Sequence, residues 1–116
     1  MPRQLFAEGP CFNIPHDFAA AATNHLLMAA PGAGKALYIT DLVLTNVGTA
    51  GTIKLVEDPA GTPANITPTM AIAVNTTVAI KLDTPIKLTA NTALGITSVS
   101  CVAHGIQVNG YTAENT

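Results

Sequence analysis

The strongest constraint on the fold is a series of short apolar runs separated by turn-forming residues, which extends from residue 26 to near the C-terminus. Such spacing, with turns about every 8–12 residues, is typical of antiparallel β-proteins. No credible amphipathic helix of about ten or more residues interrupts the series. We predict strands over 26–30, 36–46, 52–57, 70–74, 77–82, 86–88, 94–99 and 102–109. The pattern therefore predicts an all-β fold, an antiparallel β-sandwich or jelly roll of about eight strands.

The longest predicted strand, 36–46, changes phase in its middle. Leu37 and Ile39 fall on one face of a regular strand, whereas Leu42 and Leu44 fall on the other. One extra residue near Asp41 would bring all four side chains to the same face, so we predict a β-bulge there. Further turns are expected at 47–51, at 83–85 and at Gly110, where the last strand should end.

The chain carries very little charge. Its 116 residues include five Lys and Arg and seven Asp and Glu, so only 10% are charged while 48% are hydrophobic. Ordinary soluble domains contain about 25% charged residues. A single domain with so few charges has few charged side chains with which to cover its solvent-exposed surface. We therefore expect a homo-oligomer or a permanent partner; a neutral, Thr-rich monomer is the alternative.

The basic residues form no cluster that could bind nucleic acid or an anionic membrane surface; they are Arg3, Lys35, Lys54, Lys81 and Lys87. No apolar run is long enough to span a bilayer, and the first ten residues lack the apolar segment of a signal peptide. Cys11 and Cys101 are isolated thiols. We expect a reduced cytosolic assembly, although a disulfide between the two is left open.

No catalytic or cofactor-binding motif emerges. The segment around Gly34 and Lys35 lacks both the first glycine and the hydroxyl residue of a phosphate-binding loop, and a strand follows it. Ser98, Ser100 and Cys101 lie near His104 without a nucleophile elbow.

Metal and acid–base sites are equally unsupported. His16, His25 and His104 are far apart in the sequence and form no metal-ligand motif. Asp41, inside an apolar strand, is expected to satisfy backbone amides at the bulge rather than to act as an acid. We predict no enzyme, no cofactor and no metal site.

Residues 1–24 differ from residues 25–116 in the spacing of their apolar side chains. We predict that residues 25–116 form the sandwich domain. The first segment has no steady period, and its apolar side chains are Leu5, Phe6, Phe12, Ile14 and Phe18. We predict an irregular N-terminal arm in which these five residues bind a partner. The alternative is that they form an irregular first layer of the core.

Three stretches carry a resemblance to a known class of protein: GKALYITDLVLTN, TTVAIKLDTPIKLTANTALGITSV and GIQVNGYTA. Together with GTIKLVED, they resemble the small jelly-roll capsid decoration, or cement, proteins of tailed bacteriophages, over about residues 26–113. The resemblance implies a homotrimer or dimer on the outside of the head. There it would bind the major capsid protein and bridge capsomers, having been assembled in the host cytoplasm.

A second hypothesis is a carbohydrate- or receptor-binding module of a phage head or tail fibre. Similar strand–turn phrases occur in such fibres. Sugar sites usually contain aromatic platforms, however, and the β region has no Trp and only Tyr38 and Tyr111.

Overall fold

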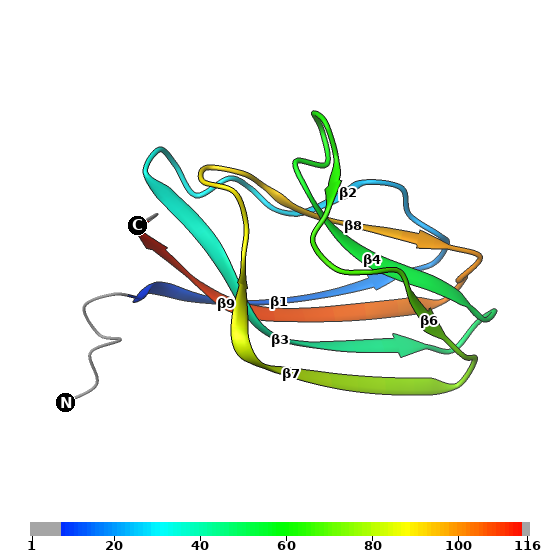
Figure 1. The fold of residues 1–116 in the computed structure, drawn as a ribbon. Helices are drawn as coiled ribbons and strands as arrows, with labels where there is room; N and C mark the ends of the chain where they lie inside the picture. The colour runs from blue at the N-terminus through cyan, green and yellow to red at the C-terminus, as the bar shows by residue number, and fades with distance from the viewer. Residues whose placement is uncertain (1–7, 115–116) are drawn as a thin grey trace.

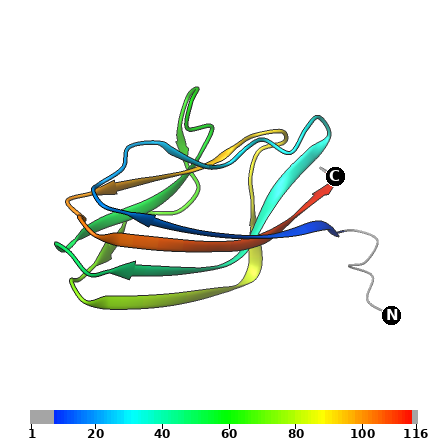
Figure 2. The same cartoon turned by 180° about the vertical axis from the view of Figure 1, so that it is seen from behind.

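The computed structural model describes residues 8–114, and within that range the chain consists only of strands and loops (Figures 1 and 2). The strands are β1 (Glu8–Phe18), β2 (His25–Met28), β3 (Lys35–Asn46), β4 (Gly51–Glu57), β5 (Ala64–Asn65), β6 (Met70–Ile72), β7 (Thr76–Lys87), β8 (Leu94–Val99) and β9 (His104–Glu114). The predicted all-β class is confirmed.

Two antiparallel sheets pack face to face as a sandwich. One has the order β1-β9-β3-β7, and the other has the order β2-β8-β4-β5 with β6 also paired to β4. Each connection crosses to the other sheet, except the path from β4 through β5 to β6. With the two-residue β5 set aside, this is the eight-stranded arrangement of a jelly roll. The predicted architecture is therefore confirmed.

The core between the sheets is built mainly from leucine and isoleucine, which supply the apolar area whose burial stabilises a domain of this size. Its fully buried members include Leu37, Ile39, Leu42, Leu44, Ile53, Leu55, Leu88, Leu94, Ile96 and Val108. Strand β3 alone contributes four of them, because it lies inside its sheet, between β9 and β7.

The predicted bulge in β3 is present. Its register shifts between Ile39 and Asp41 against both neighbours; Ile39 pairs with Gly110 and Asp41 with Asn109 of β9. Thr40 is the extra residue. The insertion corrects the phase, so the apolar side chains before and after it enter the same core.

The turn expected at 83–85 is instead an irregularity within one long strand. Residues 76–87 form β7, which pairs with β3 on both sides of the irregularity. Between the pairs Asp41–Lys81 and Ile39–Ile86, β7 advances five residues while β3 advances two. Pro85 cannot donate a ladder hydrogen bond, so the chain bulges here and then rejoins β3.

The largest difference from prediction is at the N-terminus, where residues 8–18 form a strand. Strand β1 pairs with β9 from Phe12 to Phe18 without interruption. It is an edge strand of its sheet, which is where a proline such as Pro15 is tolerated. The segment is therefore a strand and not an irregular arm over these residues, apart from one register shift between Glu8 and Cys11. Leu5 and Phe6 lie outside the described residues.

The last strand does not end at Gly110 but runs to Glu114. A Cβ at Gly110 would collide with the carbonyl oxygen of Tyr38 and lie 2.7 Å from Cζ of Phe12. Gly110 thus permits close packing inside the sheet instead of terminating a strand.

Candidate functional site

Four loops gather at one end of the sandwich, and none of them contains a charged residue. They comprise residues 19–24, 47–50, 73–75 and 100–103, and they lie at the right-hand end in Figure 1. We call these loops, with Val99 at the end of β8, the uncharged end. Four valines there remain open to solvent: Val47 is 66% exposed, Val99 57%, Val102 48% and Val74 46%.

The side chain of Asn46, at the end of β3, ties three segments of the uncharged end together. Only 1% of this residue is exposed. Its Nδ2 donates to the carbonyl oxygens of Thr49 at 2.9 Å and Ile72 at 3.4 Å, and its Oδ1 accepts from the Gly48 amide at 3.2 Å. A buried amide with its groups satisfied in this way fixes the positions of the loops that it joins.

The loops 47–50 and 100–103 are also joined directly. The amides of Val47 and Gly48 donate to the Ala103 carbonyl oxygen at 2.9 and 3.0 Å. A Cβ at Gly48 would lie 2.6 Å from the Ala103 nitrogen and 3.0 Å from Cβ of Val102. Glycine therefore allows the two loops to approach closely, which places Val47 and Val102 on one continuous surface.

The loop 19–24 is anchored to β8. The Ala22 amide donates to Oγ of Ser98 at 2.9 Å, and the Ser98 amide donates to the Ala22 carbonyl oxygen at 2.7 Å. Thr97 similarly binds Asn24 through its hydroxyl group. All of these anchors are neutral, so the uncharged end presents a fixed apolar surface suited to contact with another protein.

A second surface is the outer face of the four-stranded sheet. Across its middle, the register aligns Asn13, Asn109, Asp41 and Lys81. The Asp41 carboxylate accepts from the Thr40 hydroxyl at 2.9 Å and from Nδ2 of Asn109 at 3.2 Å. Asp41 therefore binds polar groups beside the bulge, but its donors are side chains and not the backbone amides that were expected.

The two tyrosines of the chain meet on the same outer face. Tyr38 and Tyr111 are paired across β3 and β9, and their rings stack with centroids 5.0 Å apart and planes 8° apart. The sequence separates them by 73 positions, so only the strand order reveals this aromatic pair.

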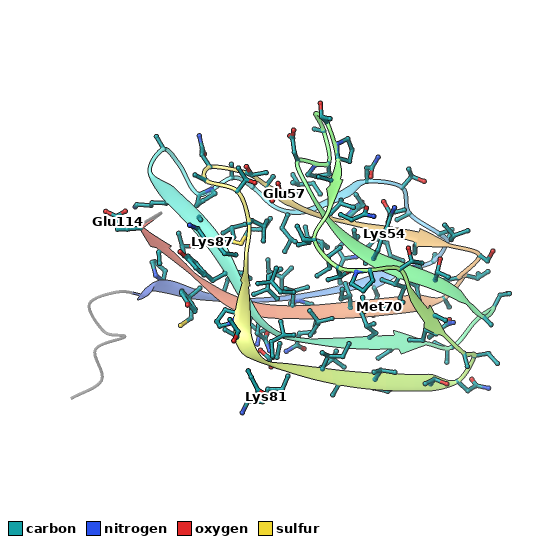
Figure 3. All side chains as sticks on the ribbon, viewed as in Figure 1. Lys54, Glu57, Met70, Lys81, Lys87 and Glu114 are labelled. Atoms are coloured by element: carbon teal, nitrogen blue, oxygen red, sulfur yellow. The ribbon has the colours of Figure 1, made fainter. Side chains whose placement is uncertain are left out.

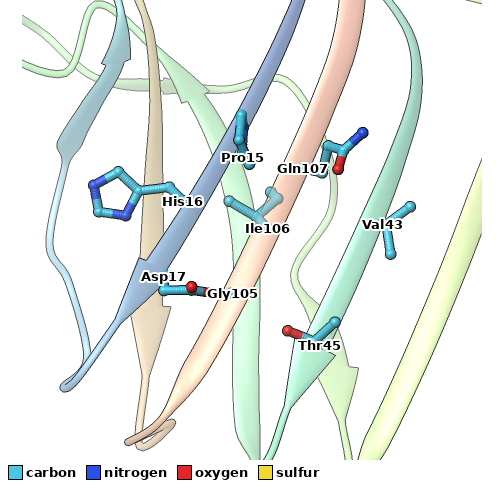
Figure 4. Close-up of a pocket in the computed structure, with 8 residues that line it drawn as sticks. All are labelled: Pro15, His16, Asp17, Val43, Thr45, Gly105, Ile106 and Gln107. Carbon is cyan, nitrogen blue, oxygen red and sulfur yellow. The ribbon is translucent and has the colours of Figure 1, made fainter.

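A shallow hollow of about 150 Å³ lies further along this face, over Gly105 (Figure 4). Its lining residues include Pro15, Asp17, Val43, Thr45 and Gln107. A Cβ at Gly105 would lie 2.7 Å from Oδ1 of Asp17 and 3.0 Å from Oγ1 of Thr45. The hollow exists because position 105 has no side chain.

The predicted partner-binding residues that the structure describes belong to the inner side of β1. Phe12, Ile14 and Phe18 are half-buried, whereas the alternate positions 11, 13, 15 and 17 are exposed. Phe12 and Phe18 pack against the core cluster. This period-two pattern in CFNIPHDF is the sequence signal of a strand, and it places these three side chains on the inner face of β1.

The three histidines, distant in sequence, meet around Phe18. The Phe18 ring stacks on His16 at 4.3 Å and on His104 at 4.9 Å between centroids, and it meets His25 edge-on at 5.1 Å. The ring centroids of His16 and His25 are 4.8 Å apart. Within residues 8–114, no group of three or more His, Cys, Asp or Glu side chains could hold a metal ion.

The two cysteines are free thiols in different surroundings. Cys11 is exposed, whereas Cys101 is buried in the uncharged end. Burial raises the pKa of the Cys101 thiol, and a backbone hydrogen bond partly opposes that effect. A raised pKa lowers the thiolate fraction at neutral pH, so Cys101 is a poor nucleophile.

No helix among the described residues is long and apolar enough to cross a bilayer. A scan against protein-family models found no match, and neither did a search of curated proteins.

Among solved structures, the chain is similar to the CBM22-1–GH10 modules of Clostridium thermocellum endo-1,4-β-D-xylanase 10B, complexed with xylohexaose. The identity is 16% and the TM-score 0.40. The match covers 88% of this chain and 26% of the other, so this chain spans about a quarter of that length.

Proposed function

We propose that this chain is a structural virion protein that binds the outside of a bacteriophage head through its uncharged end and stabilises the shell by bridging capsomers. The single observation that supports docking at this end is the set of four exposed valines on loops that carry no charge. The resemblance of residues 26–113 to capsid decoration proteins supports the choice of partner, the major capsid protein.

The energetics of such docking favour a multivalent protein. Covering one half-exposed valine contributes about 1–2 kcal/mol, so four contribute about 4–8 kcal/mol. Association costs about 4–15 kcal/mol in lost freedom of motion. One chain alone would then bind weakly, whereas linking several copies raises the avidity by about 10² to 10⁴. We therefore propose that the functional unit is a homo-oligomer, most simply a trimer.

Strand β7 supports self-association, because it is a long edge strand with incomplete cover. Val78 and Ile80 pair with Leu44 and Leu42 and so face the space between the sheets. Val78 is nevertheless 36% exposed, and Ile80 is only partly buried. No charge occurs over residues 76–80, and uncharged edges without proline readily pair with another chain.

The test is binding of the purified protein to expanded, undecorated heads, measured by co-sedimentation and by added density in electron microscopy. We expect Val47→Asp and Val102→Asp to reduce head binding at least tenfold, because each places a charge in the apolar surface. The matched control is Ala33→Asp, which adds the same charge to an exposed loop at the other end. Equal binding by all three variants would rule out docking through the uncharged end.

A second candidate function, glycan binding, is favoured by one observation: the stacked Tyr38–Tyr111 pair beside the amide and carboxylate groups of Asn109 and Asp41. Sugars are commonly held by an aromatic face together with a few polar groups. On a glycan array, binding that disappears with Tyr111→Ala but persists with Val47→Asp would support this function. No binding to any glycan, alongside binding to heads, would reject it.

A further inference from the structure

The outer face of the four-stranded sheet carries side chains in regular rows, because cross-strand partners project to the same face. Tyr111 of β9 and the hollow over Gly105 (Figure 4) lie at opposite ends of these rows, about 20 Å apart at about 3.4 Å per residue. The rows across β1, β9 and β3 are Cys11, Tyr111 and Tyr38; Asn13, Asn109 and Asp41; Pro15, Gln107 and Val43; and Asp17, Gly105 and Thr45. The chemistry of the face therefore changes from aromatic to polar along its length.

Between the tyrosine pair and the hollow, a chain of side-chain hydrogen bonds holds a strip of amide and carboxylate groups in place. Nε2 of Gln107 donates to Oδ1 of Asn109 at 3.4 Å, and Nδ2 of Asn109 donates to Oδ2 of Asp41 at 3.2 Å. Oδ1 of Asp41 accepts from the Thr40 hydroxyl at 2.9 Å. Side chains that their neighbours already hold lose little freedom when a ligand binds, so this strip is preorganised.

The strip and the hollow still have donors and acceptors to offer a ligand. Each amide of the strip has a second N–H group, and each carboxylate oxygen of Asp41 can accept a further hydrogen bond. At the hollow, Oδ1 of Asp17 and Oγ1 of Thr45 converge over Gly105, and neither side chain makes a hydrogen bond within residues 8–114. A hydroxyl group both donates and accepts. A ligand rich in hydroxyl groups therefore matches this surface.

The charges on this face favour a neutral ligand. Asp17 and Asp41 contribute two negative charges, and β7 contributes two positive charges, because Lys87 pairs with Tyr38 and Lys81 pairs with Asp41. The rows therefore carry no net charge once β7 is included. A polyanion would meet both carboxylates without a basic patch to attract it, whereas a neutral chain would meet only hydrogen-bonding groups and an aromatic platform.

We propose that the outer face of the four-stranded sheet binds a neutral, linear oligosaccharide that lies along β9, with one sugar ring on the tyrosine pair and another at the hollow over Gly105. Stacked aromatic rings supply apolar area for a sugar ring, and the polar strip orients the hydroxyl groups between the two contacts. This inference rests on the second candidate function, glycan binding, and adds the ligand class and a second contact. It does not depend on docking through the uncharged end.

The distance between the two contacts predicts how affinity depends on the length of the sugar chain. A disaccharide is too short to reach from the tyrosine pair to the hollow, whereas a hexasaccharide is long enough. Two contacts made by one ligand reinforce each other, because the second contact forms within the complex. We expect a hexasaccharide to bind at least tenfold more tightly than the disaccharide of the same series.

The experiment applies the full chain to a glycan array of neutral and acidic oligosaccharides of graded length, followed by calorimetry with the series that binds most tightly. Thr45→Val removes a hydroxyl group from the hollow, and Gly105→Ala fills it. We expect each variant to weaken hexasaccharide binding at least fivefold and to leave disaccharide binding unchanged. Tyr111→Ala should weaken the binding of both ligands at least tenfold.

The matched control is Thr77→Val, which makes the same change at the β7 partner of Thr45, outside the lining of the hollow, and should leave binding unchanged. If Tyr111→Ala abolishes binding but Thr45→Val and Gly105→Ala, folded by circular dichroism, bind like the wild type, the extended site is refuted and glycan binding stands. Tighter binding of acidic than of neutral oligosaccharides would overturn the ligand class. Binding to no glycan on the array would reject the glycan function and this inference with it.

Discussion

The two ends of the sandwich solve the same structural problem with different chemistry. At the uncharged end, loops are joined by a buried amide, Asn46, and by backbone carbonyl groups. At the other end, the Glu57 carboxylate holds the loop 88–93, accepting from the Thr89 amide at 2.9 Å and from its hydroxyl at 2.7 Å. Figure 3 shows Lys87 and Glu114 toward this charged end.

The contrast shows that the fold itself does not require neutral loops. A jelly roll that uses a carboxylate to join loops at one end could do so at the other. The absence of charge over four separate loops is therefore a property of the surface, which is what a docking function needs. We expect the two ends to differ in stability as well as in chemistry.

The largest effect should come from deleting residues 1–18. This deletion removes β1 and exposes the side of β9 that β1 covers, including the face against which Phe12 and Phe18 pack. We expect an unfolded or aggregated product, detected by loss of the β-sheet circular dichroism signal and of a cooperative thermal transition. A folded, soluble product would mean that β1 is a dispensable arm and that the body of the sandwich starts at β2.

Asn46→Ala should destabilise the uncharged end strongly. The substitution removes three hydrogen bonds and leaves the buried carbonyl oxygen of Ile72 without this donor. We expect a loss of about 2–4 kcal/mol in the free energy of unfolding, measured in urea. Thr23→Ala, at an exposed position in the loop 19–24, is the control and should change it by less than about 0.5 kcal/mol.

Glu57→Gln should have a smaller effect at the charged end. Its bonds to Thr89 lie in an exposed setting, where charge-assisted interactions are screened by water. We expect a loss of about 0.5–1 kcal/mol in the free energy of unfolding, measured in urea. A double-mutant cycle with Thr89→Ala should give a coupling energy of similar size. A loss larger than that of Asn46→Ala would mean that the charged end, and not the uncharged end, contributes more to stability through its loop-joining side chain.

Thiol labelling of the wild-type protein should distinguish exposed Cys11 from buried Cys101, and it requires no substitution that could alter stability. Cys11 is exposed, whereas Cys101 is buried and its thiol has a raised pKa. We expect iodoacetamide at pH 7.5 to modify Cys11 at least tenfold faster than Cys101, as followed by mass spectrometry. Raising the pH should speed the reaction of Cys101, because its thiolate fraction grows. Equal rates in the native protein would show that the uncharged end opens readily.

Several elements could be predicted from the sequence because local signals agreed with the tertiary structure. The residues 94–99 form β8 as expected, and the phase change at Asp41 marks a real bulge. In both places, alternation of apolar side chains corresponds to one buried face. The number and spacing of such runs predict a β-sandwich or jelly roll, and the strand order shows that it is a jelly roll.

Other features could not be predicted, because they depend on which strands are neighbours in the folded protein. Pro15 and His16 interrupt the apolar alternation in β1 and conceal a strand that occupies a sheet edge. The histidine cluster and the tyrosine pair join residues from strands that are adjacent only in space. Likewise, the lack of charge in four loops is visible in the sequence, but their gathering at one end is a consequence of the strand order.

The strand directions also have a practical consequence. Strand β1 begins and β9 ends at the charged end, where Glu8 pairs with Ala113. A domain fused after Glu114 would therefore point away from whatever the valines contact. If the docking surface is correct, the protein would serve as a carrier that displays added cargo outward while leaving its adhesive side clear.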